Sequence, residues 1–79
     1  MNHHNLKIAP EHYNNVAAGT KTFEIRVNDR AFQKGDTVTL HLVRDGLYVT
    51  DVTDLYFKIG DVYPIDAERV VFSLLAMGV

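Results

Sequence analysis

The sequence predicts one small, mainly β domain with a single short helix, an α+β fold that forms a small open or closed barrel. Three observations predict it: apolar and polar residues alternate in several short segments, glycine-containing turns separate these segments, and one short stretch has helical spacing. A chain of 79 residues has room for one hydrophobic core, so residues 1–79 are expected to be a single domain. Because the chain contains no cysteine, packing must stabilise it without disulfide bonds.

The first two predicted elements are a strand and a helix. Leu6 and Ile8 alternate with polar neighbours, as in a half-buried strand that ends before Pro10. The run 11–18 then spaces its apolar residues as a helix does, with Pro10 in the first turn and Gly19 as the C-cap. We therefore expect one helix of about two turns directly after the first strand.

The clearest predicted strand covers residues 21–27. From position 23 onward the odd-numbered residues are apolar and the even-numbered residues are polar or charged. Successive side chains of a strand point to opposite faces, so each set shares one face. We expect the apolar set to point into the core: Phe23, Ile25 and Val27. The opposite face then carries the polar set: Thr22, Glu24 and Arg26.

The rest of the chain alternates strands with turns. Turns are predicted at 28–30, 34–36 and 44–46, and strands at 37–43, 47–53 and 55–59. A break is predicted at Gly60 and Asp61, followed by an irregular connection at 64–69 and a last strand at 70–76. That last strand is apolar enough to be buried on both faces. Asp36 is expected to bond to the backbone of its own turn. The predicted core contains Phe23, Ile25, Val38, Leu40, Val71, and Leu74 or Phe72.

Charge and length exclude several classes of protein. The net charge of −2 argues against a strongly basic nucleic-acid binder. The charge is nevertheless uneven, with five basic against three acidic residues in positions 1–34 and three against seven in positions 35–79, so an anion-binding face belongs to the first part. No signal-peptide pattern or membrane-spanning stretch is present, and we expect a cytoplasmic protein with no membrane partner. Phosphate-loop and nucleophile-elbow motifs are also missing.

Several short motifs together are similar to a known family. They are the string His4 to Ile8, the G-T-K-T-F-E-I-R segment at 19–26, N-D-R at 28–30, Phe32, and G-D at 35–36. The chain resembles the ASCH superfamily, a branch of the PUA-like folds, and especially its short bacterial and phage members, which are described only as a domain of unknown function. The resemblance covers residues 4–42. It implies a PUA-like β-barrel with a cleft beside the strand from Lys21 to Arg26, proposed to take RNA or modified nucleotides.

The resemblance also raises an enzymatic alternative. Some ASCH members are amidohydrolases that remove an acyl group from the exocyclic nitrogen of acetylated cytidine, using a lysine, a threonine three residues later, and a glutamate near the last strand. Lys21 matches the lysine, but Glu24 stands at the threonine position and the last strand carries no carboxylate. If the chain is an enzyme, Lys21 and Glu24 are its expected catalytic residues.

Five side chains are candidates for binding RNA or a nucleotide: Lys7, Lys21, Glu24, Arg26 and Arg30. A guanidinium can present its fork to a phosphate or a base edge, and a carboxylate can accept a hydrogen bond from an exocyclic amine such as cytosine N4. Each has a structural alternative. Glu24 and Arg26 can form an ion pair that orders the fold, Arg30 can bond to backbone carbonyls, and the two lysines can be solvated.

No metal or other cofactor is predicted. Adjacent His3 and His4 do not easily face one ion from a strand, and no cysteine is available as a ligand. Four aromatic side chains of the second half can stack bases, but in so small a domain we expect them in the core: Tyr48, Tyr56, Phe57 and Tyr63.

Three functions remain open from the sequence. The leading hypothesis is a non-catalytic module that binds RNA or a nucleotide. The alternatives are an amidohydrolase acting on N4-acylated cytidine-type nucleosides, and an inhibitor or adaptor that binds a basic protein through the acidic residues 35–79. The oligomeric state is not predicted.

Overall fold

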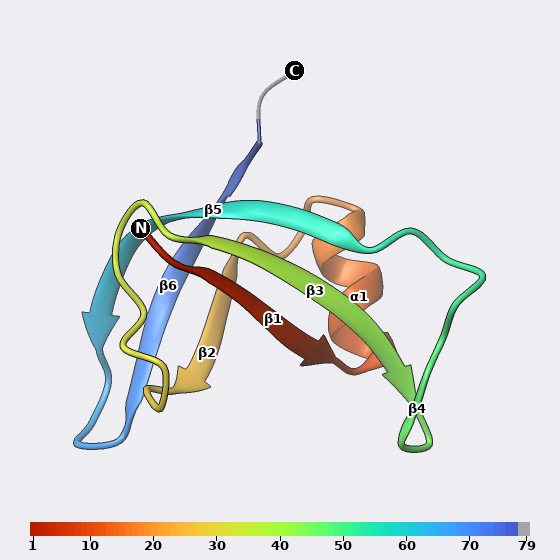
Figure 1. The fold of residues 1–79 in the computed structure, drawn as a ribbon, viewed down its shortest axis with the longest axis horizontal. Helices are drawn as coiled ribbons and strands as arrows, with labels where there is room; N and C mark the ends of the chain where they lie inside the picture. Colours follow the sequence, from red (N-terminus) through yellow and green to blue (C-terminus); the bar gives the residue numbers. More distant parts are fainter. Residues whose placement is uncertain (78–79) are drawn as a thin grey trace.

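The computed structural model describes residues 1–77, which fold into one sheet with one helix (Figure 1). In chain order the elements are β1 (His3–Ile8), α1 (Pro10–Ala17), β2 (Phe23–Val27), β3 (Thr37–Arg44), β4 (Leu47–Tyr48), β5 (Leu55–Pro64) and β6 (Arg69–Ala76). The predicted helix is confirmed: it begins at Pro10, and Gly19 just beyond its end has a φ of +79°, which glycine adopts without strain. The mainly β fold with one short helix is therefore confirmed.

The six strands form one sheet in the order β1-β3-β5-β6-β2, with β4 paired to β3. β1 runs parallel to β3, and the other ladders are antiparallel. Within residues 1–77 no ladder joins β1 to β2, so the sheet is not closed into a barrel. Two arginine side chains connect these edges instead: Arg26 Nη2 donates to the carbonyl oxygen of Lys7 at 2.8 Å, and Arg30 Nη1 to that of Asn5 at 2.9 Å.

The core lies between the sheet and α1 and contains apolar side chains from almost every element. Its fully buried members are Val38, Leu40, Ile59 and Phe72, and Leu74 is also buried, which confirms four of the predicted core positions. Val71 is only half-buried, and Leu75 is 49% exposed. The prediction that the last strand is buried on both faces is therefore wrong, because β6 has one face toward the core and one outward.

The predicted facing of β2 is also wrong. Phe23, Ile25 and Val27 are 42%, 48% and 54% exposed, whereas Glu24 is 3% exposed. The cause is the ladder with β6, in which Glu24 lies opposite Phe72 and Ile25 lies opposite Val71. Residues directly opposite each other in a ladder project to the same face. Burial of the Phe72 ring therefore turns Glu24 inward and Ile25 outward.

The second half departs from its prediction in two further places. The strand expected at 47–53 is limited to Leu47–Tyr48, and the break expected at Gly60 does not occur, because β5 continues through it with a register shift between Ile59 and Val62. A Cβ on Gly60 would overlap the Ser73 side chain, so this glycine permits the close approach of β6. Tyr48, Tyr56 and Tyr63 are more than half exposed and are not core residues.

Asp36 is buried in the predicted turn and makes more than local bonds. Its Oδ2 accepts from the backbone N–H of Gln33 at 3.1 Å and lies 2.9 Å from His4 Nε2, and its Oδ1 accepts from the backbone N–H of Asn2 at 3.1 Å. Burial acts to raise the pKa of Asp36, but the hydrogen bonds outweigh it and hold the pKa below the ordinary value. The carboxylate thus ties the N-terminal residues to the turn before β3.

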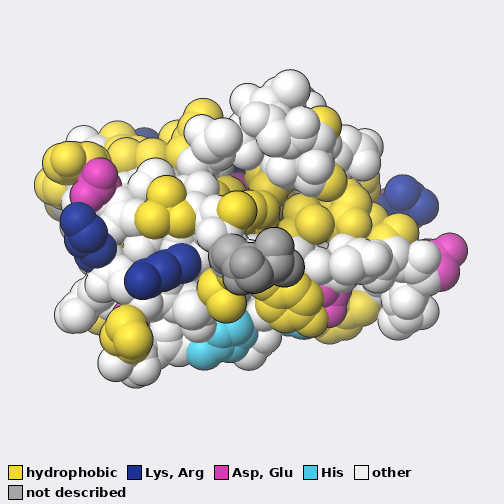
Figure 2. Space-filling view, turned by 90° about the horizontal axis from the view of Figure 1, so that it is seen from above, with side chains coloured by type: hydrophobic (Ala, Val, Ile, Leu, Met, Phe, Trp, Pro, Cys, Tyr) yellow, Lys and Arg dark blue, Asp and Glu magenta, His cyan; other side chains and the backbone are white. Residues whose placement is uncertain are grey.

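The surface is mixed in character. On the face seen in Figure 2, exposed apolar side chains cover much of the surface, and most of the few basic groups lie toward its two ends. This face of the described chain therefore carries no continuous basic field, and anion binding there would depend on local sites. Among residues 1–77, no helix has the length and apolar character needed to cross a membrane.

Candidate functional site

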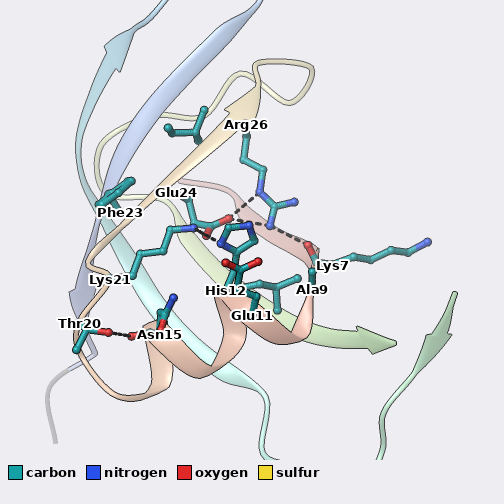
Figure 3. Close-up of a pocket in the computed structure, with 12 residues that line it drawn as sticks. Lys7, Ala9, Glu11, His12, Asn15, Thr20, Lys21, Phe23, Glu24 and Arg26 are labelled. Carbon is teal, nitrogen blue, oxygen red and sulfur yellow. Dashed lines mark hydrogen bonds and ion pairs between the residues drawn. The ribbon is translucent and has the colours of Figure 1, made fainter. Parts of the chain in front are cut away.

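A large cleft lies between β2, the first two turns of α1 and the end of β1 (Figure 3). Its volume is about 710 Å³, which falls within the range of small-molecule sites. The short loop that follows α1 closes one end and brings the chain from Gly19 into β2. That loop is short, so β2 begins close to the end of the helix, and the two elements form facing walls of the cleft. The cleft beside the strand from Lys21 to Arg26 therefore exists where the sequence predicted it.

Glu24 lies at the centre of this cleft and is almost completely buried. Its Oε1 accepts a hydrogen bond from Lys21 Nζ at 3.2 Å, and its Oε2 accepts one from Arg26 Nε at 2.8 Å (Figure 3). Burying a carboxylate without partners would cost roughly several kcal/mol, and the contacts with these two cations offset that cost. Each carboxylate oxygen has two lone pairs, and the carboxylate therefore keeps the capacity to accept from a ligand.

Lys21 points into the cleft, which decides the side that strand alternation left open. Its ammonium lies 3.2 Å from His12 Nδ1 as well as 3.2 Å from Glu24 Oε1, and 5.5 Å from the centre of the Phe23 ring. An ammonium can only donate, so Nδ1 of His12 accepts and the ring proton of the neutral imidazole lies on Nε2. The N–H of His12 is thus directed away from Lys21.

Arg26 connects the cleft to the neighbouring strand. Its guanidinium is only partly exposed and bonds to the Glu24 carboxylate through Nε and to the Lys7 carbonyl through Nη2. These bonds fix the plane of the guanidinium. Within the described residues they do not use Nη1, whose two N–H groups remain as donors for a ligand.

The structure brings together three of the five predicted binding residues and places two elsewhere. Lys7 contributes its carbonyl to the wall of the cleft, but its ammonium points away from Glu24 and lies 5.7 Å from the centre of the Tyr48 ring (Figure 3). Arg30 lies outside the cleft, where its Nη1 donates to the Asn5 carbonyl. Arg30 therefore makes the backbone contact that was its structural alternative.

Sequence reasoning missed the contribution of α1. Glu11 and His12 line the cleft from the first turn of this helix, and neither was among the predicted binding residues. The signal was the short connection, because few residues separate the end of α1 from the start of β2 and the helix must therefore lie close to that strand. In residues 1–77, no group of three His, Asp or Glu side chains is arranged to hold a metal ion.

The charged groups that point into the cleft are nearly balanced. Lys21 and Arg26 oppose the carboxylates of Glu24 and Glu11, and His12 adds a neutral ring. Such a site offers donors and acceptors on one wall without a large excess of positive charge. It suits a planar polar group such as a nucleobase better than a cluster of phosphates.

Comparisons with known proteins place the chain in a family. The family described as domain of unknown function (DUF3850) matches residues 3–74, which include every element from β1 to most of β6 and the whole cleft. The chain is also 35% identical over 60 residues to the uncharacterized 12.9 kDa protein in the GpA 3' region of Escherichia phage P2. This match covers 66% of the chain and 55% of the phage protein, so the chain spans about half the length of that relative. The chain therefore belongs to the DUF3850 family of domains of unknown function.

Proposed function

We propose that this chain is a small, non-catalytic binding module of the ASCH or PUA-like type that takes RNA or a nucleotide in the cleft between β2 and α1. One observation carries the proposal: the buried Glu24 carboxylate is held between Lys21 and Arg26 on the inward face of β2. A buried ion cluster stabilises a fold no better than apolar packing of the same volume. Its presence in a cleft, beside apolar residues that face outward on the same strand, favours a binding role.

The chemistry of the cluster matches one edge of a nucleobase. The Glu24 carboxylate can accept from an exocyclic amine, while Arg26 and Lys21 can donate to the ring nitrogen and carbonyl beside that amine. Cytosine carries these three groups side by side. Because both cations are already bonded to Glu24, they are held in position before a ligand arrives, which lowers the entropic cost of binding.

Several features of the fold support the assignment to the ASCH and PUA-like group. The cleft beside the G-T-K-T-F-E-I-R segment is where the resemblance implies one, and the mainly β architecture agrees with it. The proposed barrel goes further than the open sheet seen in residues 1–77. Where a closed barrel would have a ladder between β1 and β2, Arg26 and Arg30 bond to the β1 carbonyls.

Calorimetric titration with cytidine, uridine and cytidine 5'-monophosphate tests the proposal. Glu24→Gln and Arg26→Gln should each weaken cytidine binding by about tenfold or more, the loss of one charge-assisted hydrogen bond. Arg69→Gln is the matched control, since Arg69 forms an exposed ion pair with Asp66 at 2.8 Å and does not line the cleft. Thermal midpoints of all variants are measured in parallel. Lost stability without a separate loss of binding would identify a structural ion cluster, as would the absence of binding to the wild type at low salt.

An amidohydrolase acting on N4-acylated cytidine-type nucleosides is the second candidate, and the position of Lys21 favours it. Its ammonium lies 3.2 Å from both the Glu24 carboxylate and the His12 ring inside the cleft. There it could donate to the oxygen of an acyl group under attack by water, while Glu24 takes the proton from that water and passes it to N4 as the C–N bond breaks, which releases cytidine and the carboxylic acid. Release of cytidine from N4-acetylcytidine, compared between wild type and Lys21→Ala, decides the question. Equal rates in the two proteins would exclude the amidohydrolase hypothesis.

A further inference from the structure

A second groove lies on the other side of Arg26 from the main cleft. It has a volume of about 470 Å³ and is lined by β1, β3, β4 and the segment after β2. We call it the Tyr48 groove and define it by Lys7, Arg26, Arg30, His41 and Tyr48. Lys7 and Arg26 line both this groove and the cleft, so the two sites are neighbours that share a wall.

The Tyr48 groove differs from the cleft in its charge. Lys7, Arg26 and Arg30 supply three cations, and no carboxylate lines the groove. Two carboxylates lie close by and are engaged: Asp54 Oδ2 is 3.1 Å from His41 Nδ1, and Asp29 is 3.9 Å from Arg30. The groove lining therefore contains basic side chains without a carboxylate, whereas the cleft lining contains both. An anionic group such as a phosphate fits the groove better than it fits the cleft.

Tyr48 adds an aromatic surface to these cations. Its residue is 58% exposed on the two-residue strand β4. The ring lies between the Lys7 ammonium, 5.7 Å from its centre, and the His41 ring, which meets it edge-on at 6.0 Å. His41 is held in turn by Asn5 Oδ1 at 3.1 Å from its Nε2. An exposed aromatic ring beside a positive groove is the combination that binds single-stranded nucleic acid.

We propose that the Tyr48 groove binds the nucleotide next to the one held in the main cleft, so that the ligand is a single-stranded RNA segment of at least two nucleotides. This inference rests on the proposed function of the cleft. The phosphate that links the two nucleosides would lie at Arg26, the residue common to both sites. Lys7 and Arg30 would neutralise the flanking phosphate, and the second base would stack on Tyr48.

Two binding measurements test this proposal. Fluorescence anisotropy measures the affinity for labelled homopentanucleotides of each of the four RNA bases, and a separate titration measures the affinity for unlabelled nucleoside monophosphates. Tyr48→Ala should weaken pentanucleotide binding by about 5- to 100-fold, as expected for the loss of one stacked base, and should leave monophosphate binding unchanged. Lys7→Gln should lower the slope of log affinity against log salt by about 1, because one phosphate contact is removed.

Matched controls are available on the same sheet. Tyr63 is 62% exposed on β5 and lies outside both sites, as does the exposed Lys58. Tyr63→Ala and Lys58→Gln should bind the pentanucleotides as the wild type does. Thermal midpoints confirm that every variant is folded.

The outcomes separate the two proposals. If Glu24→Gln loses pentanucleotide binding but Tyr48→Ala and Lys7→Gln do not, the groove inference is wrong and the cleft proposal stands. If the wild type binds monophosphates as tightly as every pentanucleotide, the groove inference is likewise overturned. If the wild type binds neither kind of probe at low salt, the proposed function falls and the inference falls with it.

Discussion

The orientation of β2 decides whether Glu24 faces the cleft, and paired alanine substitutions test it. Leu40 is fully buried, so Leu40→Ala should cost about 2–5 kcal/mol through lost transfer energy and the cavity left behind. Ile25 is 48% exposed, so truncation removes only about half of the burial energy of such a side chain, or about 1 kcal/mol. In a domain of this size each kcal/mol lowers the thermal midpoint by about 4–8 °C.

Thermal unfolding followed by circular dichroism provides the comparison. Ile25→Ala should lower the midpoint by about 4–8 °C, and Leu40→Ala by about 10 °C or more, with equal slopes in urea for both variants. Equal losses in the two variants would show that Ile25 points into the core. In that case the alternation of the strand would turn Glu24 outward, and the cleft cluster described above would not exist.

Two further predictions concern the rest of the fold. Folding lowers the pKa of Asp36 from 3.8, so its contribution to stability should be complete above about pH 4 and be lost as the pH falls through the folded pKa. Asp36→Asn should therefore be less stable than the wild type at pH 7. In urea titrations below pH 4, the variant should lose stability less steeply with falling pH than the wild type. Parallel curves for the two proteins would contradict this. Gly60→Ala should destabilise the fold by about 1–3 kcal/mol, because the new Cβ would overlap the Ser73 side chain. Adding Ser73→Ala should recover part of that loss. A double variant no more stable than Gly60→Ala would rule out the steric cause.

The sequence by itself determined the helix and most of the strands, although it misplaced strand ends in the second half. Local patterns that act within a few residues were sufficient for this. They are the period of two in Phe23 to Val27 and in Thr37 to Val43, and the positions of Pro10 and Gly19 at the two ends of the helix. It also determined that Glu24 and Arg26 share a face, because that follows from the pleat of a single strand. The cleft beside this strand was expected from the family resemblance, because the pleat of one strand does not show what lies against its face.

The tertiary structure alone decided which face of β2 is buried. Alternation supplies two faces but does not say which one meets the core, and apolar character favoured Phe23 and Ile25. The choice was made by the register against β6, where the buried Phe72 lies opposite Glu24. Ladder register depends on residues almost fifty positions apart in the chain, and its energy comes from packing that no single segment contains. The same reason explains why Lys7 and Tyr48, from distant strands, meet beside Arg26 in a groove that the sequence did not reveal.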